Sequence, residues 1–111
     1  MITEYVLFKL PRGMTREAVV ENYRKTVPKW RANADLVRKN YLYDREGGWG
    51  GGVYLWKSLE AAKRGHDEAW KQYIRDLYGV EPQIRYFDTP MVQDNLVRET
   101  FEFEPAEART A

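Results

Sequence analysis

The sequence contains no cysteine, and this absence excludes disulfide bonds and any chemistry that depends on a thiolate. Histidine is almost as scarce, because His66 is the only one in the chain. Zinc sites combine several histidine or cysteine ligands. We therefore expect no metal site, and the cysteine count gives no argument for an oxidising compartment.

Long apolar runs are also missing. No stretch of 18 apolar residues occurs, and the first ten residues, MITEYVLFKL, lack the basic start and long apolar centre of a signal peptide. The charges are balanced, with 18 Lys and Arg against 17 Asp and Glu, and the basic residues are spread along the chain. The sequence therefore predicts a cytoplasmic protein that binds neither nucleic acid nor membrane.

Aromatic residues are plentiful in this short chain. Its 111 residues fit one domain, yet they include 4 Trp, 8 Tyr and 4 Phe. A chain of this length buries only about 60 to 68% of its unfolded surface. Some of the rings are therefore expected to line a cavity for a small apolar or aromatic ligand, or to form a subunit interface.

Six regular elements follow from the hydrophobic pattern. Alternating apolar residues predict strands, and apolar residues at helical spacing predict helices. The predicted order is strand 2–10, helix 15–32, strand 35–45, strand 53–57, helix 59–77 and strand 83–88. This β-α-β-β-α-β order predicts an α+β, ferredoxin-like fold, in which a four-stranded antiparallel sheet carries two helices on one face.

Two helices cover only one face of such a sheet, so the other face would meet water. We therefore expect a homodimer in which two sheets pack face to face. The domain is assigned to residues 1–95, and residues 96–111 are assigned to a C-terminal arm. Within the arm, residues 100–104 alternate and are a candidate for pairing with the partner chain, whereas residues 105–111 are expected to be disordered.

The segment GGWGGGVYLW, residues 47–56, raises the question of a phosphate-binding loop. Such a loop places its glycines between a strand and a helix, whereas these glycines precede a strand, and neither GxGxxG nor GK[ST] fits. We interpret Gly47 and Gly48 as a hairpin turn, and residues 50–52 as strand residues without side chains. The bare strand either permits tight packing or leaves a notch for a ligand.

His66 is the one side chain that titrates near neutral pH without help. On the predicted helix 59–77 it shares an apolar face with several residues, among them Ala62 and Trp70. It is therefore predicted to point toward the sheet. Two interpretations are open: a core residue, or a general base or acid.

Further candidate site residues are aromatic or polar. The aromatic residues form a stripe that is either core or the wall of a cavity: Tyr5, Tyr41, Tyr43, Tyr54, Trp56, Trp70 and Tyr86. Lys39, Asn40, Arg85 and Asp88 could orient a ligand, or could lie on a solvated strand face. No spacing indicates a Ser-His-Asp triad or an isolated carboxylate pair.

Two segments carry a family resemblance. GGWGGGVYLWKSLEAA and YGVEPQIRYFDTPMVQDN resemble the YdhR-like monooxygenases of the dimeric α/β-barrel superfamily, which includes the antibiotic-biosynthesis monooxygenases. In those proteins a glycine-rich strand with Tyr-Leu leads into a second helix that starts with Ser and small residues. Gly-Val-Glu and Phe-Asp motifs then follow. The resemblance covers residues 1–95 and implies a homodimeric α/β barrel with a pocket between sheet and helices.

The resemblance also implies an activity. Related enzymes need no metal or flavin, since they deprotonate a phenolic or quinol-type substrate whose anion then reacts with oxygen. Carried onto this chain, it implies His66 as the base, and as substrate-binding residues Trp30, Tyr41, Tyr54, Trp56 and Trp70. The alternative is a non-catalytic, small-molecule-binding homodimer of the same fold.

The same superfamily contains haem-degrading enzymes, in which a histidine on the second helix binds the iron. This chain has Arg75 near that position and no asparagine on its first strand. The resemblance therefore implies neither haem nor another cofactor.

Overall fold

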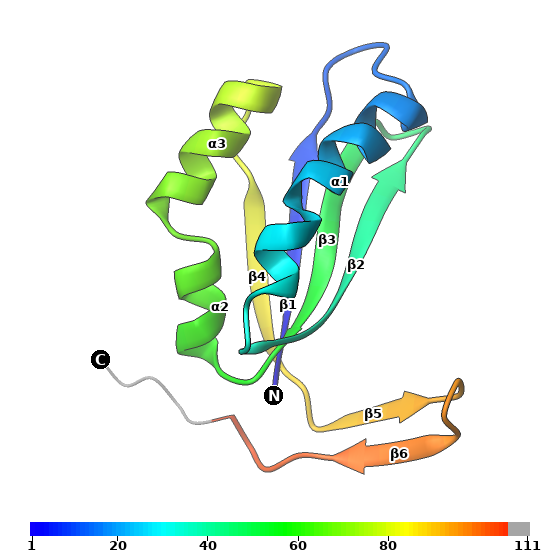
Figure 1. The fold of residues 1–111 in the computed structure, drawn as a ribbon, viewed down its shortest axis with the longest axis vertical. Coiled ribbons are helices and arrows are strands. Elements are labelled where there is room, and N and C mark those ends of the chain that lie inside the picture. Colours follow the sequence, from blue (N-terminus) through cyan, green and yellow to red (C-terminus); the bar gives the residue numbers. More distant parts are fainter. Residues whose placement is uncertain (107–111) are drawn as a thin grey trace.

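The computed structural model describes residues 1–106, with three helices on one face of a four-stranded sheet and a separate two-stranded hairpin (Figure 1). In chain order the elements are β1 (Ile2–Lys9), α1 (Arg16–Arg31), β2 (Leu36–Asp44), β3 (Trp49–Trp56), α2 (Leu59–Gly65), α3 (Glu68–Tyr78), β4 (Gln83–Asp88), β5 (Met91–Asp94) and β6 (Glu99–Glu102). Within the described part of the chain, no helix is long and apolar enough to cross a membrane.

The main sheet is antiparallel, with the strand order β2-β3-β1-β4. β1 lies between two neighbours, so that Ile2 faces Trp56 on β3 and Asp88 on β4. Alternate residues of β1, such as Val6 and Phe8, are buried because the helices cover that face. The predicted ferredoxin-like fold class is confirmed.

The prediction of one helix over residues 59–77 is wrong, because the segment forms two helices, α2 and α3. Residue His66 ends α2 with φ −120° and ψ 58°, and the Asp67 side chain starts α3 by accepting a hydrogen bond from Trp70 N at 3.0 Å. A Cβ on Gly65 would lie 2.5 Å from Cη2 of Trp56. The close packing of α2 on Trp56 thus requires glycine, a poor helix former, just before the break.

The glycine-rich segment forms a turn and then a strand, as predicted. Gly48 adopts φ +73° in the turn, and its N–H donates to Asp44 O at 2.9 Å. On β3, a Cβ on Gly50 would lie 2.6 Å from the Tyr23 hydroxyl. That hydroxyl donates to Leu42 O at 2.7 Å and accepts from Gly51 N at 2.9 Å. Neighbouring atoms fill the space over these glycines, as the tight-packing interpretation requires.

The C-terminal part of the chain forms a hairpin of its own. β6 pairs with β5, with Phe101 opposite Val92, so the segment proposed for pairing with a partner chain pairs within its own chain. The boundary placed at residue 95 falls in the turn of this hairpin. The hairpin projects from the end of β4, away from the helices (Figure 1). Of the tail expected to be disordered, residues 107–111 lie outside the described residues.

Candidate functional site

Four aromatic rings surround His66 in the core between the sheet and the helices. They belong to Trp30 from α1, Tyr54 and Trp56 from β3, and Trp70 from α3, and we call these four residues the aromatic box. The ring centroids lie 5.1, 4.5, 6.2 and 4.3 Å, respectively, from that of the imidazole. The imidazole has no exposed surface. The predicted inward orientation of His66 is therefore confirmed, although the residue lies at a helix break and not on a continuous helix.

Glu4 on β1 places a carboxyl group at the edge of this box. Its side chain is fully buried, and Oε1 accepts a hydrogen bond from Trp56 Nε1 at 2.8 Å. The same oxygen lies 2.7 Å from His66 Nδ1. Sequence analysis missed Glu4, although its register gave a signal: it shares the inward face of β1 with Ile2 and Val6.

The Glu4–His66 contact is close, but it leaves polar atoms unsatisfied. The Nδ1 contact is poorly aligned for a hydrogen bond and Nε2 has no partner among the described residues, whereas the Glu4 carboxyl group also interacts with the Tyr86 hydroxyl. Burial lowers the pKa of His66, while the neighbouring Glu4 acts in the opposite direction. Each unsatisfied buried group costs about 1–3 kcal/mol.

Lys39 on β2 brings an amine to the same layer of the molecule. It lies opposite Tyr54 in the β2–β3 register, and therefore faces the helices. Its Nζ lies 4.7, 3.9 and 4.6 Å from the ring centroids of Trp30, Tyr41 and Tyr54. The two rings of Trp30 and Tyr54 thus contact His66 in one direction and Lys39 in the other.

The charge of Lys39 is destabilised in this position. Burial and, to a smaller extent, the charge of Lys29 lower the pKa of Lys39 to about 7, while Glu4 acts in the opposite direction. The faces of the three rings favour the ammonium form and offset part of the desolvation. Near neutral pH both the protonated and the neutral form of the amine are therefore populated.

A narrow cavity of about 30 Å³ opens between α1 and α3, with room for one or two water molecules. Its lining residues are Phe8, Asn22, Tyr23, Thr26, Trp30, Lys39, Gly51, Tyr54, Trp70, Tyr73, Ile74 and Tyr78. Lys39 is the only lysine among them. The walls are mostly aromatic, which suits a flat apolar ligand.

The structure distributes the predicted site residues over this region. Trp30, Tyr54 and Trp70 line the cavity, and Lys39 joins them as a residue that could orient a ligand. His66, Trp56 and Tyr41 do not line it. Tyr41 contributes indirectly, because its ring lies beneath the Lys39 amine and its hydroxyl is 2.8 Å from that of Thr26.

Two of the other polar candidates lie elsewhere. Asn40 faces away from the helices, paired in register with Val53, and Arg85 does so opposite Tyr5. Both are exposed. They belong to the face of the sheet that carries no helix.

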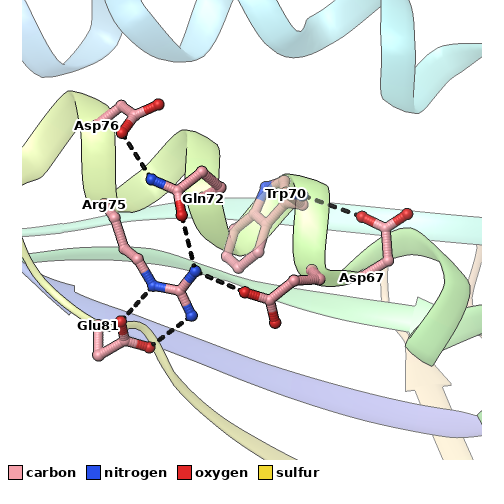
Figure 2. Close-up of polar contacts among 7 residues, drawn as sticks. Asp67, Trp70, Gln72, Arg75, Asp76 and Glu81 are labelled. Atoms are coloured by element: carbon pink, nitrogen blue, oxygen red, sulfur yellow. Dashed lines mark hydrogen bonds and ion pairs between the residues drawn. The ribbon is translucent and has the colours of Figure 1, made fainter.

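Arg75, at the position considered for an iron-binding histidine, lies outside the cavity. Figure 2 shows its guanidinium on the exposed side of α3, where it pairs with Glu81 and donates to Gln72 at 3.1 Å and to Glu68 at 2.6 Å. These carboxylates hold the pKa of Arg75 above its ordinary value. Arg75 therefore ties α3 to the segment before β4 and contacts no candidate site residue. In residues 1–106 no cluster of three His, Asp or Glu side chains could hold a metal ion.

No protein-family model and no curated protein sequence matches the chain, but several solved structures do. Protein SO0527 from Shewanella oneidensis matches with a TM-score of 0.61 at 19% identity, over 78% of this chain and 87% of its own. SnoaB, a cofactor-independent oxygenase from Streptomyces nogalater, matches with a TM-score of 0.58 at 13% identity, over 79% and 91%. A proposed antibiotic-biosynthesis monooxygenase from Deinococcus radiodurans matches with a TM-score of 0.55 at 13% identity, over 80% and 92%. The chain shares the fold of antibiotic-biosynthesis monooxygenase-like proteins.

The Lys39→Met substitution is expected to change how stability depends on pH. In the unfolded chain Lys39 keeps its proton up to about pH 10.4, whereas in the folded chain it loses it at about 7. Between these values the unfolded state binds more protons, so the wild type gains stability relative to the variant as pH rises. The gain should approach 1.4 kcal/mol per pH unit.

Chemical denaturation of both proteins between about pH 7 and pH 10 measures this difference. Lys25→Met, which removes an exposed lysine from α1, is the matched control and should leave the slope unchanged. Parallel pH profiles for wild type and Lys39→Met would show that the amine keeps an ordinary pKa.

Proposed function

We propose that the chain is a cofactor-independent monooxygenase of the YdhR-like kind, which oxidises a small phenolic or quinol-type substrate between the sheet and the helices. The observation that carries the proposal is the aromatic cavity with a single amine in its wall. The fold shared with SnoaB, described as a cofactor-independent oxygenase, supports the same reaction class. The motifs in residues 47–62 and 78–95 support the narrower family.

The chemistry requires a base and a site that excludes water, but no bound oxidant other than O₂. Removal of the hydroxyl proton makes the ring electron-rich enough to donate electrons to oxygen. For a phenol with an unsubstituted para carbon the reaction balances as phenol plus O₂ to quinone plus water. One oxygen atom enters the product, and the other leaves as water with the hydroxyl proton and the proton from the para carbon.

The residues of the cavity supply a water-poor environment for this anion. Phe8, Trp30, Trp70 and Ile74 are buried apolar walls, and in such surroundings the attraction between the phenolate and a nearby cation is stronger than in water. The cavity holds only about 30 Å³. A substrate ring must therefore displace the movable side chains of its wall, of which Tyr73 is 41% exposed.

His66 is proposed to support this site from behind its wall. Its ring contacts Trp30, Tyr54 and Trp70, which line the cavity, but does not line it itself. Together with Glu4, whose Oε1 lies 2.7 Å from Nδ1, it lies behind these three rings. We therefore assign His66 a positioning role. Its protonation state is proposed to affect the positions of the rings that hold the substrate.

The small size of the cavity favours one alternative, a homodimer that binds a small molecule without converting it. Binding alone requires the aromatic walls but neither a base nor oxygen. Under this alternative a ligand raises the melting temperature of the protein and is recovered unchanged. The oxygen measurement separates the two functions.

Oxygen consumption with a panel of phenols and hydroquinones tests the proposed function. The wild type is expected to consume one O₂ per substrate and to place one atom of ¹⁸O₂ in the product. Asn22→Trp, which puts a large ring into the cavity wall on α1, should lower turnover by at least tenfold. Arg24→Trp, on an exposed position of the same helix, should leave turnover nearly unchanged.

His66→Gln extends this test, because it removes the titrating ring and should alter the pH profile of turnover. A purely structural role would lower the amount of folded protein and leave that profile unchanged. Absence of oxygen consumption across the panel, with ligand binding retained, would establish the non-catalytic alternative.

We further propose that the chain acts as a homodimer through the face of the sheet that carries no helix (Figure 1). This face presents Tyr5 and Phe87, which are 37% and 42% exposed, beside the half-buried Val53 and Leu55. Apolar side chains that lie together on an exposed sheet are typical of an interface. Packing of two such sheets would cover them at the usual spacing of about 10 Å.

Sedimentation of the purified chain is expected to give twice the monomer mass of 13.2 kDa. Tyr5→Glu together with Phe87→Arg should shift the protein to the monomer, since charged groups would be buried in the interface. Leu77→Glu, at a residue of similar exposure (38%) on α3, is the matched control and should remain dimeric. A monomeric wild type would contradict the proposal.

A further inference from the structure

The amine of Lys39 stands out because it lies against three aromatic rings in a half-buried position and, among residues 1–106, has no counter-ion. Ion pairs between other residues do occur in the chain, as for Arg64 with Asp35 and Arg24 with Glu21. Among residues 1–106, by contrast, no carboxylate lies within 4.0 Å of Lys39 Nζ, and no hydrogen bond to it is formed. Its nearest neighbours are the faces of Trp30, Tyr41 and Tyr54.

The stem of Lys39 lies over a position of the neighbouring strand β3 that has no side chain, Gly52. A Cβ on Gly52 would lie 3.2 Å from Cε of Lys39 and 3.0 Å from Cε1 of Tyr54. Gly52 therefore makes room for the lysine stem to lie over β3 and for its amine to reach the cavity. A lysine amine that is partly removed from water and has no counter-ion is costly unless it can be neutral.

The titratable groups around Lys39 leave it as the group best able to exchange a proton there. They are Glu4 from β1, Tyr41 from β2, Tyr54 from β3, Tyr23 and Lys29 from α1, His66 from the break between α2 and α3, and Tyr73 and Tyr78 from α3. Burial raises the pKa of Tyr23 to about 12 and that of Tyr54 well above its ordinary value. Burial lowers the pKa of Lys39 to about 7, so its neutral amine is present at a pH where these phenols keep their protons.

We propose that Lys39 is the general base that accepts the hydroxyl proton of a phenol bound in the cavity. The O–H bond of the phenol breaks and a new N–H bond forms at Nζ, which leaves a phenolate beside an ammonium. This proton transfer rests on the proposed function only for what happens to the phenolate afterwards. In the proposed oxygenation, the ammonium of Lys39 returns the proton to the oxygen atom that leaves as water.

Lys39 is placed for this step in a way that His66 is not. It lines the cavity, whereas the imidazole lies beyond Trp30 and Tyr54. The ammonium formed in the transfer is then held between ring faces, which favour a cation. The product of the step is an ion pair in an apolar site, where the attraction between its members is strong.

Binding of 3-nitrophenol without oxygen tests the inference. This phenol is mainly protonated at about pH 7.5, and its phenolate absorbs visible light. Wild-type protein should show the phenolate band of the bound ligand and release no net proton to the buffer, because Lys39 takes it up. Calorimetry in buffers of different ionisation enthalpy measures the proton count.

Two substitutions separate a base from a fixed positive charge. Lys39→Arg can hold a phenolate but cannot accept its proton, since arginine stays protonated. Lys39→Arg should therefore show the phenolate band of the bound ligand and release about one proton per ligand. In Lys39→Met the intensity of this band should be at least tenfold lower. Lys25→Met, on the exposed side of α1, should behave as wild type.

A phenolate band in Lys39→Met, release of one proton by the wild type, or failure of the wild type to bind the phenol would each overturn the inference. Thermal unfolding of every variant verifies that it is folded. Because oxygen is absent, the result is independent of turnover. Proton transfer to Lys39 in a protein that consumes no oxygen would refute the proposed oxygenase and leave the inference standing.

Discussion

The absence of side chains at Gly50 and Gly52, two positions on the helix-facing side of β3, is the constraint on which the rest of the site depends. Gly50 leaves room for the Tyr23 hydroxyl, and Gly52 leaves room for the stem of Lys39. A side chain at position 50 would displace the Tyr23 hydroxyl, and one at position 52 would crowd the Lys39 stem and the Tyr54 ring. The glycines are therefore explained by the packing of the Tyr23 hydroxyl and the Lys39 stem against β3, and not by phosphate binding.

Polar groups inside the core are the second feature that organises the molecule. Glu4 and His66 are buried against Trp56, and Lys39 lies one ring further toward solvent. Aliphatic residues in these three positions would make a more stable core. Lys39 and His66 lie on opposite sides of Trp30 and Tyr54, and the positive charge of Lys39 lowers the pKa of His66.

Much of the fold could be predicted from the sequence, because strand alternation and helical spacing are local signals. The break at His66 was missed, since it arises from contacts of Gly65 and Asp67 that helical periodicity does not report. Three of the five aromatic residues predicted for the site line the cavity. Glu4 and Lys39 were not assigned these roles, because their burial depends on which strands lie beside them.

The proposed proton transfer requires a neutral amine at Lys39, held among Trp30, Tyr41 and Tyr54. The most direct measurement is an NMR titration of the Lys39 side chain, with its signal assigned by comparison with Lys39→Met. We expect a midpoint at about 7. A midpoint at the ordinary lysine value of about 10.4 would show that the amine is solvated, and would contradict both the site and the proton transfer derived from it.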